Sequence, residues 1–233
     1  MRYNDVGCQK LKKERTMTED DLTYSMKHSF AEFQKLLNNI DKQKINSSVG
    51  LYTYQEMLRF QCIAGTILED FKDVANSIDQ RNITHPLLRS LLEGWIWITY
   101  IHWENDENSK QSRFEELMNG FKIEYQKLFN DQNLPRKNEL PAIPTNEDWS
   151  QLARPRNAND MLVAVKNDYG DKLDYLYFAY RIMSFDTHAK AAEALFLEAF
   201  QQPCSFIFIQ PEKIINLIAN NYIEVMNNHL ATP

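Results

Sequence analysis

Glycine is scarce in this chain, and its scarcity limits the folds that the chain can form. Six of the 233 residues are glycine, whereas an average protein contains about 7%. Glycine readily takes the positive φ angles that tight hairpin turns and phosphate-wrapping loops require. The six positions form neither G-x-G-x-x-G nor G-x-x-x-x-G-K-[ST], the two common glycine-rich motifs for phosphate binding. The sequence therefore disfavours β-sandwiches, Rossmann domains and P-loop enzymes, and it favours a mostly helical protein.

The chain carries an excess of acidic residues. It has 26 lysines and arginines against 32 aspartates and glutamates, a net charge of −6. A protein that coats nucleic acid needs an extended basic surface to contact the phosphates. The composition therefore excludes general nucleic-acid coating but leaves room for a local basic site.

Three cysteines, Cys8, Cys62 and Cys204, lie far apart in the sequence. Their odd number and wide spacing fit neither a disulfide framework nor a C-x-x-C zinc pair, and they are consistent with a reducing cytosol. Cys62 falls within an expected helix, where we expect a core residue and not a catalyst. The basic N-terminus is followed by no apolar segment, so we expect no secretory signal and a cytoplasmic protein.

The most apolar segment, LLRSLLEGWIWITYI, covers residues 87–101. At about 15 residues it is shorter than the roughly 20 that a membrane span needs, and it contains Arg89 and Glu93. We therefore expect a buried core helix and no membrane association.

Hydrophobic residues recur every three or four positions along most of the chain, which is the period of an amphipathic helix. The pattern predicts an all-α fold, one helical-bundle domain of six or seven helices formed by residues 18–233 after a flexible N-terminus at 1–17. Thr18 can cap the first helix, and Thr84 the third, with Pro86 in its first turn. The expected helices cover about residues 18–44, 51–79, 84–101, 114–130, 159–170, 171–200 (where Asp186 and Thr187 could interrupt it) and 211–226.

Residues 131–158 contain four of the eight prolines and cannot form one long helix. A connection of about 28 residues is unusual in a compact domain, so this Pro-rich loop is either a functional lid or a mobile linker. Trp149 in its middle predicts that part of the loop docks onto the rest of the protein.

The five histidines show no helical metal-binding spacing. None has a carboxylate three residues before it, as in the Glu-x-x-His pairs of di-iron bundles, and the sequence contains no H-E-x-x-H. The usual helical metal sites are therefore not expected, although scattered ligands could still meet in space. No cofactor is predicted.

The segment YRIMSFDTHAK contains the best candidate for a catalytic site. Arg181, Ser184 and His188 lie at spacings that place them on one face of a helix. A histidine can transfer protons near neutral pH, and an arginine can stabilise the charge of a phosphorane-like transition state. An RNA substrate brings its own 2′-hydroxyl as the nucleophile, so such a site needs no metal. The alternative is that His188 caps the end of the helix and that Arg181 is an ordinary surface residue.

Arg89 and Glu93 form a second candidate pair, four residues apart on the most apolar helix. Buried charges are costly unless they are paired, so we expect an ion pair. The pair either fixes the register of the helix or orients Arg181 or His188 from a neighbouring helix. The same helix ends in aromatic residues that we expect to pack in the core and at its edge, with a base-stacking platform as the alternative: Trp95, Trp97, His102 and Trp103.

Three segments resemble a large uncharacterised family of bacterial helical proteins. They are LLRSLLEGWIWITYI, RFEELMNGFKIEYQKLF and YFAYRIMSFDTHAK, and the resemblance covers about residues 55–195. Its members have an Arg-x-x-x-Glu helix and, later, a Tyr-Arg-x-x-Ser-x-x-x-His signature. That family is similar to the HEPN superfamily of helical domains, many of which resemble metal-independent endoribonucleases of antiviral-defence and toxin–antitoxin systems.

The resemblance implies an HEPN-like bundle in which the superfamily's Arg-x(4–6)-His motif maps onto Arg181 and His188. It implies that His188 is a general acid–base and that Arg181 holds the phosphate, with Ser184, Arg89 and Glu93 in support. It also implies a homodimer with an RNA substrate in the cleft between the two copies. The alternative is a non-catalytic interaction or nucleotide-sensing module of a defence or toxin–antitoxin system, which binds a partner or antitoxin protein.

Overall fold

The computed structural model describes residues 29–71, 78–142, 147–165, 171–187, 192–205 and 207–230. These residues form eight α-helices and no β-strand, which confirms the all-α fold class. The helices exceed the expected six or seven because residues 171–200 hold two separate helices. The α-helices are α2 (Phe30–Asn38), α3 (Ser48–Asp70), α4 (Ile78–His102), α5 (Glu107–Asn130), α6 (Ala158–Ala164), α7 (Asp171–Thr187), α8 (Ala192–Phe200) and α9 (Pro211–Val225), the last extended by a π-helical turn, Met226–Leu230.

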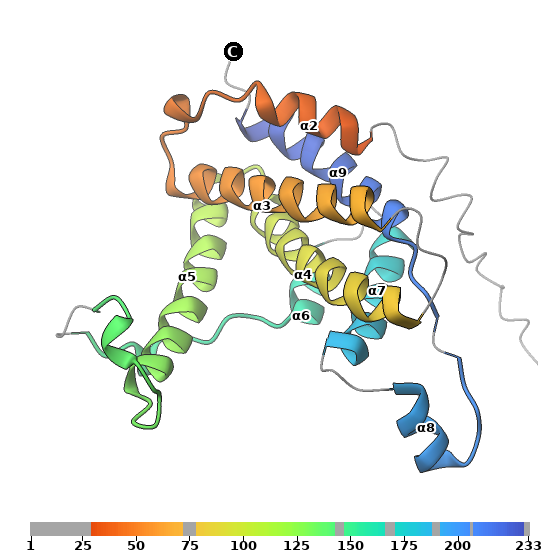
Figure 1. Ribbon diagram of the computed structural model, residues 1–233. Helices are drawn as coiled ribbons and strands as arrows, with labels where there is room; N and C mark the ends of the chain where they lie inside the picture. The colour runs from red at the N-terminus through yellow and green to blue at the C-terminus, as the bar shows by residue number, and fades with distance from the viewer. Residues whose placement is uncertain are drawn as a thin grey trace, which may run out of the picture.

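Helix α4 lies at the centre of the bundle (Figure 1) and packs against α3, α5, α6, α7 and α9. Its apolar stretch is buried as expected, with Leu88, Leu91 and Ile98 fully covered. Because apolar side chains occur on nearly all its sides, other helices must surround α4 to remove them from water. The charged residues of α4 are therefore held in place by the core of the protein.

Helix α2 packs along α9, and both helices contact α3 (Figure 1). The ring of Phe60 meets the rings of Phe33 and Tyr222 edge-on, each at 5.1 Å between centroids. The backbone N–H of Phe30 also donates to Asn216 Oδ1 at 2.9 Å. These contacts join the first described helix to the last across most of the sequence.

Helix α4 begins earlier than the sequence predicted. It starts at Ile78 and not at Thr84, so that Pro86 lies inside the helix. Pro86 offers no N–H to the carbonyl of Asn82, but Asn82 is exposed and water can satisfy that carbonyl. The buried Thr84 hydroxyl donates to the Gln80 carbonyl, so this residue is not a helix cap.

Other helix boundaries differ from the prediction because short polar side chains cap backbone N–H groups. Helix α2 ends at Asn38, before a separate turn that is capped by Asp41. Helix α3 starts after its cap Ser47 and ends at Asp70, not at residue 79. Helix α5 starts after its cap Asp106, earlier than the expected residue 114.

The described part of the 131–158 loop runs beside α5. It contains two short 3-10 turns, η2 (Lys137–Glu139) and η3 (Trp149–Gln151), and η3 packs against α5. The Lys122 ammonium lies 5.7 Å from the centre of the Trp149 ring. The expected docking of Trp149 onto the rest of the protein is therefore confirmed.

Two of the predictions concern residues that the structure does not describe. The expected flexible segment 1–17 and the helix start at Thr18 lie outside the described residues.

Cys62 is exposed on α3, so its expected place in the core is wrong. The buried residues Phe60 and Ala64 share one face of α3, and Cys62, two positions from each, points the other way. No helix in the described ranges is long and apolar enough to cross a bilayer.

Candidate functional site

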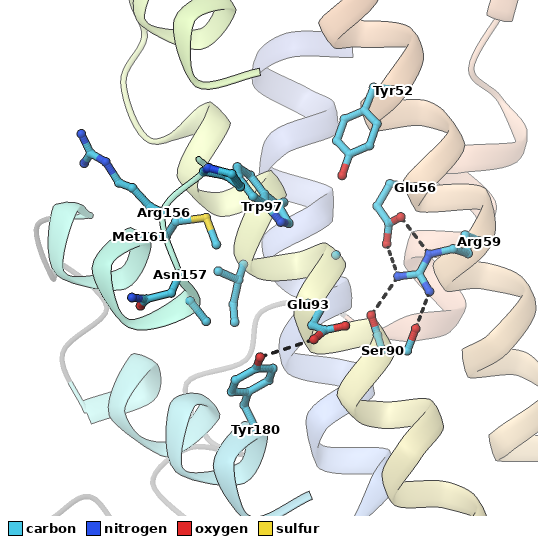
Figure 2. A pocket seen from close by; sticks show the side chains of 14 residues that line it. Tyr52, Glu56, Arg59, Ser90, Glu93, Trp97, Arg156, Asn157, Met161 and Tyr180 are labelled. Atoms are coloured by element: carbon cyan, nitrogen blue, oxygen red, sulfur yellow. Dashed lines mark hydrogen bonds and ion pairs between the residues drawn. The ribbon is translucent and has the colours of Figure 1, made fainter. Parts of the chain in front are cut away.

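A cavity of about 560 Å³ opens between α3, α4, α7 and the start of α6 (Figure 2). Residues 155–157, which lead into α6, form part of its wall. Asn157 begins α6 because its side chain accepts the Asp160 N–H at 3.0 Å. The cavity thus joins helices that are distant in sequence, and its wall combines aromatic rings with paired charges.

One side of the cavity is built on a tightly fixed arginine of α3. The Arg59 guanidinium donates to both Glu56 carboxylate oxygens, at 2.6 and 2.8 Å. It also crosses to α4, where it donates to the Ser90 hydroxyl at 2.8 Å and to the Ser90 carbonyl at 2.9 Å (Figure 2). Hydrogen bonding to Glu56 raises the pKa of Arg59, so this side chain is a permanent cation held in one orientation.

Gly94 makes this arrangement possible. A Cβ atom added at this position of α4 would lie 1.8 Å from Glu56 Oε1 and 2.7 Å from Arg59 Nη2. The paired side chains therefore lie directly over the backbone of α4, where only a residue without a side chain leaves space.

Two tyrosine hydroxyls lie in the electrostatic field of the Glu56–Arg59 pair. Burial, and then the Glu56 charge, raises the pKa of Tyr52, which lines the cavity, and of Tyr222 on α9. Both hydroxyls therefore stay protonated. The Tyr222 hydroxyl is fully buried and has no hydrogen-bond partner among the described residues.

A second arginine, Arg89, connects α4 to α7 through contacts with Tyr180 and Ser184. Its guanidinium lies 2.8 Å from Glu93 Oε1 and donates to the Ser184 hydroxyl at 3.0 Å. It also donates to the Tyr180 hydroxyl at 3.1 Å and lies 4.7 Å from the centre of that ring. The Tyr180 hydroxyl in turn donates to Glu93 at 3.3 Å. Of this cluster, Glu93 and Tyr180 line the cavity, and Figure 2 shows them at its lower edge.

The structure thus brings together three of the five residues singled out in the sequence: Arg89, Glu93 and Ser184. Arg181, on the same helix as Ser184, is exposed and makes no hydrogen bond or ion pair with any described residue. His188 lies outside the described residues.

Sequence reasoning missed a buried network behind the cluster. His85 Nδ1–H donates to Asp186 at 2.7 Å, and its Nε2 accepts the Ile209 N–H at 3.1 Å. Arg81 lies 3.3 Å from the other Asp186 oxygen. Burial is the main effect that lowers the pKa of His85. Because Nε2 accepts a hydrogen bond while Nδ1–H donates one, His85 is neutral and has no free nitrogen for catalysis. Its two hydrogen bonds join α4 to α7 and to the segment before α9.

Sequence reasoning also missed Glu56, Arg59 and Gly94, although the sequence contains a pattern that indicates each of them. Glu56 and Arg59 have the i, i+3 spacing of a helical ion pair, and Gly94 interrupts the most apolar helix. That these three residues meet depends on the packing of α3 against α4, which the sequence pattern does not specify.

The described residues that line the cavity include no histidine and no cysteine. No group of three or more His, Cys, Asp or Glu side chains within the described ranges could hold a metal ion. No protein-family model, no curated protein and no solved structure matches the chain.

Proposed function

We propose that this chain is a cytoplasmic, nucleotide-sensing helical module that binds a nucleotide in the cavity between α3, α4 and α7. The observation that carries this proposal is a cavity of about 560 Å³ in which aromatic rings stand beside pre-oriented charged groups. Ligand pockets in proteins commonly measure about 300–1,000 Å³ and combine an apolar wall with a few fixed polar groups.

Each part of a nucleotide has a matching group in the cavity wall. Trp97 and Tyr180 supply aromatic rings for a base to stack on. Glu93, whose side chain is 47% exposed, can accept hydrogen bonds from a base amino group or a ribose hydroxyl. The exposed Arg156 at the rim is held by only one ion pair with a described residue, 3.7 Å from Glu116, and is available for a phosphate.

The carboxylates of the cavity do not repel such a ligand. Glu56 is paired with Arg59, and Glu93 is paired with Arg89. The ion pairs hold these side chains in place, so binding does not have to order them. Pre-organised groups of this kind lower the entropic cost of association.

Calorimetric titration of the full chain with the four ribonucleoside 5′-monophosphates tests the proposal. We expect at least one of them to bind, and we expect Glu93→Gln and Arg156→Ala each to weaken binding about tenfold. Lys44→Ala, which removes an exposed charge outside the cavity, is the matched control and should change nothing. Absence of binding by all four nucleotides at millimolar concentration would refute the proposal.

A second candidate, a metal-independent endoribonuclease of a defence or toxin–antitoxin system, is favoured by the surface around Arg181. Arg181, which makes no ion pair with a described residue, shares one face of α7 with two exposed phenylalanines, Phe178 and Phe185. Helix α8 adds Leu195, Leu197 and Phe200, all about half exposed or more. A homodimer that covers these apolar side chains would bring two copies of Arg181 together.

This second function predicts that the purified protein sediments as a dimer and cleaves RNA without added metal. His188→Ala should abolish cleavage while the circular dichroism spectrum is unchanged. Cleavage that persists in this variant would exclude His188 as the acid–base. A monomer that cleaves no RNA would instead favour sensing, or the binding of a partner or antitoxin protein, without catalysis.

A further inference from the structure

A second cavity of about 450 Å³ adjoins the first. It lies between α4 and α5, and its wall includes Leu117, Phe121 and Arg154. Trp97 and Pro155 line both cavities, so the two share a wall. Most of the second cavity is apolar, and the exposed ring of Phe121, at 62%, stands at its edge.

Pro155 belongs to a short strap, residues 154–156, with the sequence Arg-Pro-Arg. Arg154 lines the second cavity and Arg156 lines the first. Pro155 is seated against α5 at Gly120, where a Cβ atom would come within 2.8 Å of the proline ring. This close approach fixes Pro155, the middle residue of the strap, between the two arginines in the sequence.

Neither cation of the strap is strongly neutralised. Arg154 is exposed and makes no ion pair or hydrogen bond with a described residue. The Arg156 guanidinium lies 3.7 Å from Glu116 and 5.6 Å from the centre of the Tyr100 ring, which places it on the side of the strap that faces α5. An anion located at the strap would therefore meet two arginines.

We propose that the paired cavities bind two linked nucleotide units, with the phosphodiester that joins them held at the strap by Arg154 and Arg156. This inference rests on the proposed function of the first cavity and names its ligand class. Each cavity has an aromatic side chain in its wall and an arginine of the strap beside it, as the two bases and the linking phosphate of a dinucleotide require. Trp97 and Tyr180 stack on the first base, and Phe121 stacks on the second. A mononucleotide would leave the second cavity and Arg154 unused.

The test compares adenosine 5′-monophosphate with 5′-phosphoadenylyl-(3′→5′)-adenosine on the full chain by calorimetry. We expect the dinucleotide to bind at least about tenfold more tightly, since stacking of one more base and one more charge-assisted contact each contribute a factor of that order. Arg154→Ala and Phe121→Ala should each weaken dinucleotide binding about tenfold and leave the monophosphate unaffected. Both residues are exposed, so these variants should fold, and Lys44→Ala is again the control.

The possible outcomes separate the two proposals. If the monophosphate binds and the dinucleotide binds no more tightly, the two-unit ligand is wrong and the first cavity remains a mononucleotide site. If the dinucleotide binds more tightly but Arg154→Ala makes no difference, the role of the strap is wrong. If neither the dinucleotide nor any of the four monophosphates binds, both proposals are wrong.

Discussion

His102, the last residue of α4, should make the protein less stable in mild acid. It is 8% exposed and lies beside a cavity of about 250 Å³. The Thr53 hydroxyl donates its proton to the Val49 carbonyl, so its oxygen must accept the Nε2–H of His102 at 2.8 Å. His102 Nδ1 therefore carries a lone pair, and it has no hydrogen-bond partner among the described residues.

The surroundings oppose protonation of that nitrogen. Burial is the main cause that lowers the pKa of His102 to about 3, and His229 and Lys110 add to the effect. His229 stacks on the His102 ring at 4.7 Å between centroids, and its Nδ1 accepts a hydrogen bond from the Lys110 ammonium at 3.2 Å. The carboxylate of Glu107 pairs with Lys110, and Glu224 also lines the cavity.

The sign and size of the effect follow from the two pKa values. The unfolded chain takes up a proton on His102 below the ordinary pKa of 6.5, whereas the folded chain does so only near 3. The free energy of unfolding therefore falls as the pH drops below 6.5. Between about pH 8 and about pH 5, this one residue should remove about 2 kcal/mol.

Urea unfolding of the wild type and of His102→Gln at several pH values isolates this contribution. Glutamine can still donate to Thr53 but does not titrate, so the wild type should lose about 2 kcal/mol more than the variant over this range. Equal losses in the two proteins would refute the reasoning. If the variant does not fold, an NMR titration of the His102 ring provides the same test, and a ring that titrates near 6.5 would refute it.

Four further substitutions test the packing of the helices, each by thermal or urea unfolding. Gly94→Ala should destabilise the protein by about 1–3 kcal/mol because the new methyl group displaces Glu56. Gly65→Ala, with no atom near the new Cβ, should instead stabilise α3 by up to about 1 kcal/mol. Equal changes in the free energy of unfolding for the two variants would contradict the crowding at Gly94. Asp186→Asn should cost up to about 3–5 kcal/mol because it removes the more deeply buried of the two carboxylates that pair with Arg81, and a change below about 1 kcal/mol would show that Glu193 alone compensates that charge. Ser184→Ala should cost about 1 kcal/mol because Arg89 loses one acceptor, and an unchanged midpoint would mean that water replaces the hydroxyl.

Local sequence patterns were sufficient to predict the all-α fold, although not the ends of several helices, and one part of the site. The apolar stretch at residues 87–101 predicts a buried helix, and it is the centre of the bundle. The spacing of Arg89 and Glu93 predicts an ion pair within one helix, and the two side chains lie 2.8 Å apart. Such features depend on residues three or four positions apart, so the period of the helix brings them together whatever the rest of the chain does.

The cavities were decided by tertiary structure. Arg59 meets Ser90 across 31 residues, and Arg89 meets Tyr180 across 91. Pro155 meets Gly120 only because the loop runs beside α5. Which helix faces meet is determined by the combined burial of all their apolar side chains, and no short stretch of sequence carries that information. The scarcity of glycine predicted a helical protein, but only the packing of α3 on α4 shows that Gly94 makes room for the charged pair beside the cavity.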